Sequence, residues 1–128
     1  MAVPTMGVTV LDCPDTRRLA EFYAGVLGWR VDESRSDSAW TEVADEHGRR
    51  RLAFQEAPGL VPPEWPSGGH SQQLHLDLDV PSSRIEEAER EVLALGARLL
   101  QDDGGGTRGF RVYLDPAGHP FCLCLADR

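Results

Sequence analysis

Residues 72–81 read QQLHLDLDVP, and the last four of them, LDVP, nearly repeat the LDCP found at residues 11–14. A second pair of motifs follows the first, with LGWRV at 27–31 and LGARL at 95–99. The two pairs are separated by 67 and 68 residues, so the registers of the two halves differ by one inserted residue. A repeat at a nearly constant offset indicates two copies of one structural unit.

A helix is expected between the two motifs of each copy. Apolar residues recur at helical spacing over residues 19–27 and again over residues 85–95. Asp15 stands where a side chain would cap the first helix. Ser83, with Glu86 three residues later, has the spacing of a capping box for the second helix.

Alternating and turn-bounded segments predict three strands after each helix. These expected strands are 29–34, 39–44, 50–56, 97–102, 109–114 and 120–126. Four prolines and three glycines exclude regular structure from residues 57–72. The chain is therefore predicted to be one α+β domain over residues 1–128. It would consist of a βαβββ module at 5–57, a linker at 58–72 and a second βαβββ module at 73–127.

Three stretches carry a resemblance to a known family: the LGW that closes the first helix, the HLDLDV that opens the second half, and DPAGHPFCLC near the C-terminus. Together with the duplicated unit, they resemble the glyoxalase / bleomycin resistance / extradiol dioxygenase superfamily, also called vicinal oxygen chelate proteins. The nearest type within it is the small actinobacterial glyoxalase-like domain. The resemblance implies a curled mixed sheet with helices on its convex face, a cleft on its concave face, and a homodimer.

The alternation of side chains along each strand predicts which residues face this cleft. Over residues 74–80 the leucines and Val80 would pack under the helix, which leaves His75 and Asp77 on the opposite face. Over residues 109–114, Phe110, Val112 and Leu114 are expected to pack under the helix as well. The residues assigned to the cleft are Trp40, Gln55, His75, Asp77, Arg111, Tyr113 and Cys122, with Trp65 of the linker closing over them.

Metal-dependent members of the superfamily take four ligands from the cleft, and the resemblance places these at Val8, Gln55, His75 and Cys122. Val8 offers no donor atom. A divalent metal would therefore be held by His75, Gln55 and Cys122, with a carboxylate from Asp77 as a further donor, and a hard cation prefers oxygen ligands to such a set. We expect no complete metal site and no cofactor, and we interpret His75 as a polar residue of the pocket.

Charge and composition limit the classes of partner that the protein can bind. The chain has 21 acidic and 13 basic residues and a net charge of −8, which disfavours nucleic acid and anionic membranes as partners. Its apolar runs are too short to span a bilayer, and no signal sequence is evident. Three cysteines give no disulfide framework, so we expect a cytoplasmic protein.

Three functions are compatible with these features. The favoured one is binding of a small organic molecule, aromatic or antibiotic-like, in the cleft, where Trp40 and Trp65 would stack on it. The alternative is a lyase or isomerase of the glyoxalase type that acts on a small carbonyl or thiol adduct. In that case His75 would be the catalytic base, with a divalent metal near it. The third is a dimerising scaffold that binds no ligand.

Overall fold

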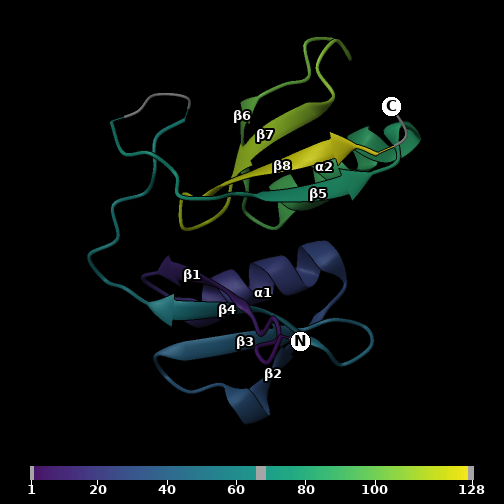
Figure 1. Cartoon of the computed structure of the whole chain (residues 1–128). Helices are drawn as coiled ribbons and strands as arrows, with labels where there is room; N and C mark the ends of the chain where they lie inside the picture. The colour runs from purple at the N-terminus through teal and green to yellow at the C-terminus, as the bar shows by residue number, and fades with distance from the viewer. Residues whose placement is uncertain (1, 66–68, 127–128) are drawn as a thin grey trace. The chain divides into compact units, whose positions relative to one another are not determined.

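The computed structural model describes residues 2–65 and 69–126 (Figure 1). The chain divides into two compact units, Met1–Leu60 and Val61–Arg128. Within the described residues each unit holds a four-stranded mixed sheet and one α-helix. The fold is α+β with two tandem βαβββ modules, as the repeat predicted, and the division after Leu60 falls inside the predicted linker.

Module 1 follows the predicted order of elements. Its parts are β1 (Thr9–Cys13), α1 (Thr16–Leu27), β2 (Arg30–Asp32), a 3-10 turn (Glu33–Arg35), β3 (Trp40–Ala44) and β4 (Arg50–Glu56). The strands are ordered β1-β4-β3-β2. β1 runs parallel to β4, and the other neighbours are antiparallel.

Module 2 repeats this topology. Its parts are β5 (Leu76–Val80), a 3-10 turn (Ser82–Arg84), α2 (Ile85–Ala94), β6 (Arg98–Gln101), β7 (Phe110–Leu114) and β8 (Pro120–Leu125). The strands are ordered β5-β8-β7-β6, with β5 parallel to β8. The matching strand orders confirm that the two halves are copies of one unit. No helix among the described residues is long and apolar enough to cross a membrane.

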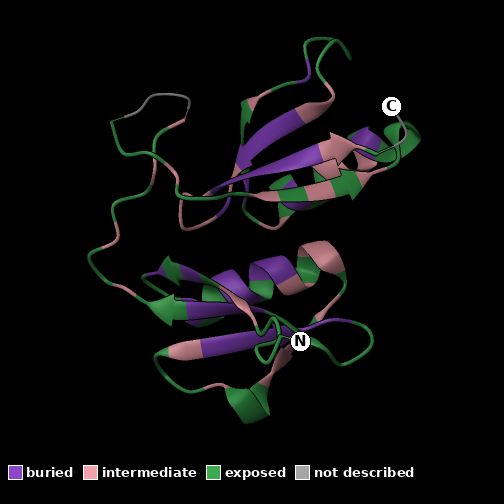
Figure 2. Ribbon diagram, viewed as in Figure 1, coloured by how far each residue is buried: buried purple, intermediate pink, exposed green. Residues whose placement is uncertain are grey.

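The core of module 1 lies between α1 and one face of its sheet, where buried residues gather (Figure 2). Tyr23 of α1 stacks on Phe54 of β4, with ring centroids 5.8 Å apart and planes 9° from parallel. The hydroxyls of Thr16 and Thr41 are hydrogen-bonded at 2.9 Å between α1 and β3. Asp15 accepts a hydrogen bond from the backbone N–H of Arg18, which confirms the predicted N-cap.

The predicted capping box of the second helix is wrong. Ser83 lies inside the 3-10 turn that precedes α2, and Arg84 occupies the N-cap position without a side-chain cap. The turn forms because the N–H of Arg84 bonds to the carbonyl of Pro81. Ser83 therefore already has helical backbone geometry, whereas an N-cap residue needs a non-helical one. Arg84 instead forms an ion pair with Glu87, one turn into the helix.

Strand β7 faces the opposite way from the prediction. Arg111 donates hydrogen bonds to Glu86 at 2.7 Å and to Asp103 at 2.9 Å, and the hydroxyl of Tyr113 donates to Glu89 at 2.8 Å. Glu86 and Glu89 belong to α2. Arg111 and Tyr113 therefore lie on the helix side of the sheet, and their predicted place in the cleft is wrong.

The reversal of β7 has a physical cause. Hydropathy alone would put Phe110, Val112 and Leu114 under the helix. A buried guanidinium is tolerated there because carboxylates surround it and satisfy its donors. The strand register then places Val112 opposite Cys122, so both lie on the face away from α2.

Candidate functional site

The candidate site lies on the face of the second sheet that points away from α2, and we call it the His75 face. The parallel pairing of β5 with β8 places Asp77 opposite Cys122 and Asp79 opposite Cys124. Phe121 and Leu123, the intervening residues of β8, are buried on the opposite face of the sheet, which packs against α2. Because side chains alternate along a strand, the two carboxylates and the two thiols share the His75 face.

Three potential ligand atoms come together on this face. The Nε2 of His75 lies 3.1 Å from Oδ1 of Asp77, and the side chains are 31% and 58% exposed. The ligand atoms of His75, Asp77 and Cys122 all lie within 4.8 Å of one another. Cys122 is buried, at 4% exposure. The structure thus unites three of the predicted site residues around one point.

The thiols of this face are protonated at neutral pH. Burial raises the pKa of the Cys122 thiol to about 12, and the negative charge of Asp77 adds to the shift. The same two causes raise the pKa of Cys124 to about 11. Because the thiolate is the nucleophilic form, neither cysteine acts as a free nucleophile near neutral pH.

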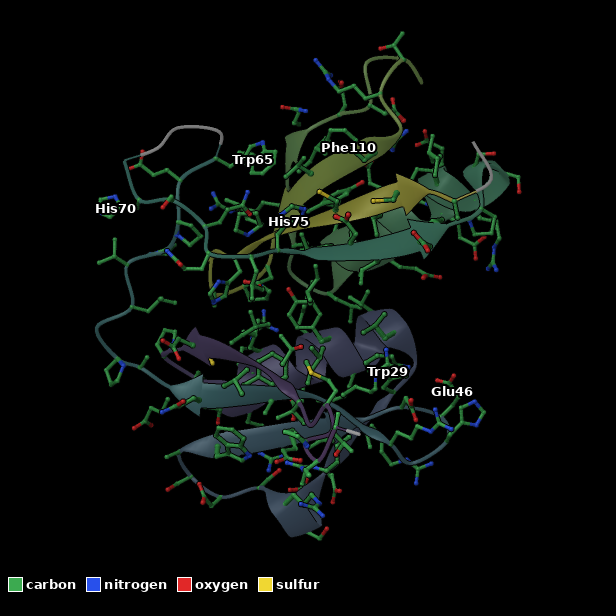
Figure 3. The ribbon with its side chains drawn as sticks, in the orientation of Figure 1. Trp29, Glu46, Trp65, His70, His75 and Phe110 are labelled. Carbon is green, nitrogen blue, oxygen red and sulfur yellow. The ribbon has the colours of Figure 1, made fainter. Side chains whose placement is uncertain are left out.

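The linker lies against the same face, through Trp65. The indole ring meets the His75 imidazole edge to face, with centroids 5.9 Å apart and planes at 78° (Figure 3). Glu64 of the same segment contacts His70, with 3.0 Å between its carboxylate and Nδ1. Gly118 is needed beside it, since a Cβ there would stand 2.8 Å from Cβ of Pro62.

Two buried polar atoms in unit 2 lack a hydrogen-bond partner among the described residues. They are the indole N–H of Trp65 and the side-chain oxygen of Gln72. One is a donor and the other an acceptor, and both residues precede β5 in the chain. Gln72 was not among the predicted site residues, because a polar side chain in an irregular segment carries no sequence signal of burial.

The remaining predicted residues, Trp40 and Gln55, belong to unit 1. They face each other across β3 and β4 on the face away from α1, as the alternation predicted. The indole of Trp40 donates to Glu42 at 2.9 Å, and Arg50 donates to the same carboxylate at 2.8 and 2.9 Å. Arg50 and then Trp40 lower the pKa of the buried Glu42 carboxyl. The structure thus groups Trp40 with Glu42 and groups Trp65 with His75.

The ligand set implied by the resemblance does not suit a hard cation. Val8 supplies no donor atom, and Gln55 supplies only an amide oxygen. The donors that lie within 4.8 Å of one another on the His75 face are an imidazole, a carboxylate and a buried thiol. Cations such as Mg²⁺ and Ca²⁺ prefer shells made of oxygen ligands, so the residues present do not fit them.

The chain has two tandem βαβββ modules, and a histidine stands immediately before the first strand of the second module. Together these features define a fold of the glyoxalase type. The family model of the glyoxalase-like domain matches residues 8–124, and the chain belongs to that family. No curated protein sequence matches it significantly.

Similar solved structures share the fold at low sequence identity. A glyoxalase/bleomycin resistance protein/dioxygenase family enzyme from Burkholderia phytofirmans has a TM-score of 0.68 at 15% identity, over 91% of this chain and 94% of that one. The fosfomycin resistance protein FosX from Mesorhizobium loti scores 0.69 at 13% identity, over 97% and 93%. A mutant FosX from Listeria monocytogenes, complexed with Mn(II) and 1S,2S-dihydroxypropylphosphonic acid, scores 0.69 at 16% identity, over 97% and 94%.

Proposed function

We propose that this protein binds a small organic molecule on the His75 face, next to Trp65. The observation that carries the proposal is the pair of buried polar atoms without partners among the described residues, the indole N–H of Trp65 and the amide oxygen of Gln72. Leaving a buried polar group unpaired costs about 1–3 kcal/mol. A ligand that accepts from the indole and donates to the amide would recover that free energy.

The charges of the face indicate the class of ligand. Asp77 and Asp79 share it with His75, and the guanidinium of Arg111 lies on the opposite side of the sheet. Two carboxylates repel an anion and favour a neutral or cationic molecule. The aromatic edge of Trp65 favours a planar one. We therefore propose an uncharged or cationic aromatic compound, in contrast to the phosphonic acid seen with the Listeria protein.

A second candidate function rests on the contact between His75 and Asp77. A carboxylate beside an imidazole fixes its tautomer and orients the ring, which is the arrangement of a general base. The Nε2–Oδ1 distance of 3.1 Å is within reach of a hydrogen bond. If the bound molecule carries a carbonyl, His75 would move a proton at the adjacent carbon, as a lyase or isomerase requires.

Thermal unfolding in the presence of a compound panel tests the binding proposal. The panel contains neutral aromatics, aromatic amines and phosphonates at equal concentration. A ligand present at 100 times its Kd stabilises by about 2.7 kcal/mol. That corresponds to a rise in Tm on the order of 10 °C for a chain of this size. We expect such a rise from a member of the first two classes and none from the phosphonates.

The control variants locate the ligand. Trp65→Ala should remove the rise in Tm, whereas Trp40→Ala, which changes the partly exposed indole of the other module, should leave it in place. A rise that survives Trp65→Ala but disappears in Trp40→Ala would move the site to module 1. If no compound of any class raised Tm, the dimerising scaffold without ligand would be the better description.

A further inference from the structure

We propose that module 1 holds a second ligand site, which binds a basic α-amino acid at the edge of the first sheet. The site is a cavity of about 410 Å³, and we call it the edge cavity. It is lined by residues 30–33, which form β2 and the start of the 3-10 turn after it, and by residues 44–46 and 48, which end β3 and form the following hairpin. Its volume lies within the range of small-molecule pockets.

The edge cavity is separate from the residues predicted to line the cleft of module 1. Trp40 pairs with Gln55 at the first residue of β3, whereas Ala44, which lines the cavity, is the last residue of that strand. Four steps along a strand span about 13 Å. The cavity therefore lies at the other end of β3, and a ligand there would be independent of one on the His75 face.

Two carboxylates of the edge cavity are already paired within module 1. Glu33 accepts hydrogen bonds from the guanidinium of Arg17 at 2.6 and 2.9 Å. The buried carboxylate of Asp45 accepts from two backbone N–H groups of its own hairpin and from the guanidinium of Arg51. Both charges are therefore neutralised by the chain itself.

Three other charged side chains of the edge cavity have charge to offer a ligand. Arg30 forms no ion pair with any residue that the structure describes. Within the same described residues, the Asp32 carboxylate accepts hydrogen bonds only from the N–H and the hydroxyl of Ser34. Glu46, on the hairpin (Figure 3), stands 3.6 Å from His47 in an exposed pair, which contributes little. One guanidinium and two carboxylates thus remain.

This set of charges matches a basic α-amino acid. A guanidinium binds a carboxylate through two parallel hydrogen bonds. A carboxylate of the protein accepts from an ammonium group, and lysine carries one carboxylate and two such cations. We expect the carboxylate of the ligand to contact Arg30 and its two ammonium groups to contact Asp32 and Glu46.

Module 2 contains the same hairpin turn with its surface covered. Asp45 and Asp115 each accept hydrogen bonds from the N–H groups two and four residues further on. A Cβ at Gly118 would stand 2.8 Å from Cβ of Pro62, so the linker covers the turn there. A Cβ at Gly48, the matching glycine of module 1, would meet nothing within 4 Å. The turn of module 1 is therefore open where its copy is occupied by the chain.

The residues that shape the edge cavity differ between the two modules. Ala44, which pairs with Arg30 between β2 and β3, immediately precedes the turn, and the larger Leu114 holds that place in module 2. Alignment of LGWRV with LGARL places Leu100 at the position of Asp32. A small residue and an acidic one in module 1 thus correspond to two leucines in module 2. The space and its charge belong to the first copy.

Calorimetric titration of the full-length protein with L-lysine at low ionic strength tests the proposal. Cadaverine, which lacks the carboxylate, and L-norleucine, which lacks the side-chain ammonium, are the comparison ligands. We expect lysine to bind saturably at one equivalent and each analogue to bind about tenfold more weakly or worse, because each lacks one charge-assisted contact. Absence of saturable lysine binding, or equal affinity for either analogue, overturns the proposal.

Matched variants place the ligand in the edge cavity. Arg30→Ala should weaken lysine binding by about tenfold and leave cadaverine binding unchanged, since only lysine has a carboxylate for Arg30. Arg18→Ala makes the same change of charge at an exposed residue of α1 and should alter neither affinity. Equal lysine affinities in these two variants would refute the site.

A second pair of variants tests the acidic side of the edge cavity. Glu46→Gln should weaken lysine and cadaverine alike, because both ligands present an ammonium group to this carboxylate. Glu56→Gln, at an exposed residue that ends β4, is the control and should change neither affinity. Lysine binding that is unaffected by Glu46→Gln would contradict the proposed contacts. Arg30 and Glu46 are both exposed, so circular dichroism should show native folding in each variant.

Discussion

Replacing Arg111 with alanine lowers the free energy of unfolding by about 3 kcal/mol, because it leaves carboxylates around β7 without their cation. The Arg111 side chain is only 10% exposed, and it lies 2.7 Å from Glu86, 2.9 Å from Asp103 and 3.2 Å from Glu89. Removing one partner of a buried ion pair costs about 3–5 kcal/mol. We take the lower end because the Glu86 side chain is 68% exposed and water screens its charge.

The cost of Arg111→Ala shrinks in acid. The guanidinium lowers the pKa of the Asp103 carboxyl and that of Glu86. A carboxyl whose pKa is lower in the folded state adds stability above its unfolded pKa and loses it as the pH falls through the folded pKa. The wild-type protein therefore loses this stabilisation below about pH 4. The stability difference between the two proteins should be smaller at about pH 3 than at about pH 7.

Urea unfolding followed by circular dichroism measures both effects. Arg108→Ala is the control, since its guanidinium stands 3.9 Å from Asp102 in an exposed pair. Exposed pairs contribute about 0–1 kcal/mol, so this variant should be nearly neutral. Equal losses for Arg111→Ala and Arg108→Ala would show that the buried network does not stabilise module 2.

Phe54→Ala has an effect of similar size in module 1. The Phe54 ring is fully buried and stacks on Tyr23, so its removal opens a cavity between α1 and β4. Truncation of a buried phenylalanine costs about 3–5 kcal/mol, through lost transfer free energy and the cavity left behind. For a chain of this size, Tm should fall by about 10 °C or more.

Scanning calorimetry measures the loss caused by Phe54→Ala. Val10→Ala, on the neighbouring strand β1 and 39% exposed, is the control and should cost less than about 1 kcal/mol. A loss below about 1 kcal/mol for Phe54→Ala would mean that the space refills and that the helix–sheet core is not close-packed.

The fold could be predicted from the sequence because each of its signals is local. The LDCP and LDVP motifs marked the repeat, and Asp15 marked the start of the first helix. The capping box at Ser83 failed because a 3-10 turn intervenes, which spacing alone does not reveal. Strand β7 failed because hydropathy ranks arginine as outward-facing, whereas Arg111 is held inside by carboxylates from α2 and from the loop after β6.

Less of the candidate site than of the fold could be predicted, because its residues are brought together by contacts between segments that are distant in the sequence. Alternation placed His75, Asp77 and Cys122 on one face of their strands, but only the β5–β8 register makes Asp77 and Cys122 neighbours. The contact of Trp65 with His75 depends on the path of an irregular linker, which no periodicity describes. The actinobacterial subtype, the homodimer and the cytoplasmic location stay predictions.

The most direct test of the proposed ligand site uses the indole signals of the tryptophans. The chain has three tryptophans, so the ¹H–¹⁵N spectrum of labelled protein offers one indole N–H signal for each. The compound that raises Tm most is titrated in, with signals assigned by single Trp→Phe variants. We expect the Trp65 indole signal to shift with saturation, as its N–H gains a partner, while the signals of Trp29 and Trp40 stay in place. Saturable movement of the Trp40 signal with a stationary Trp65 signal would contradict it.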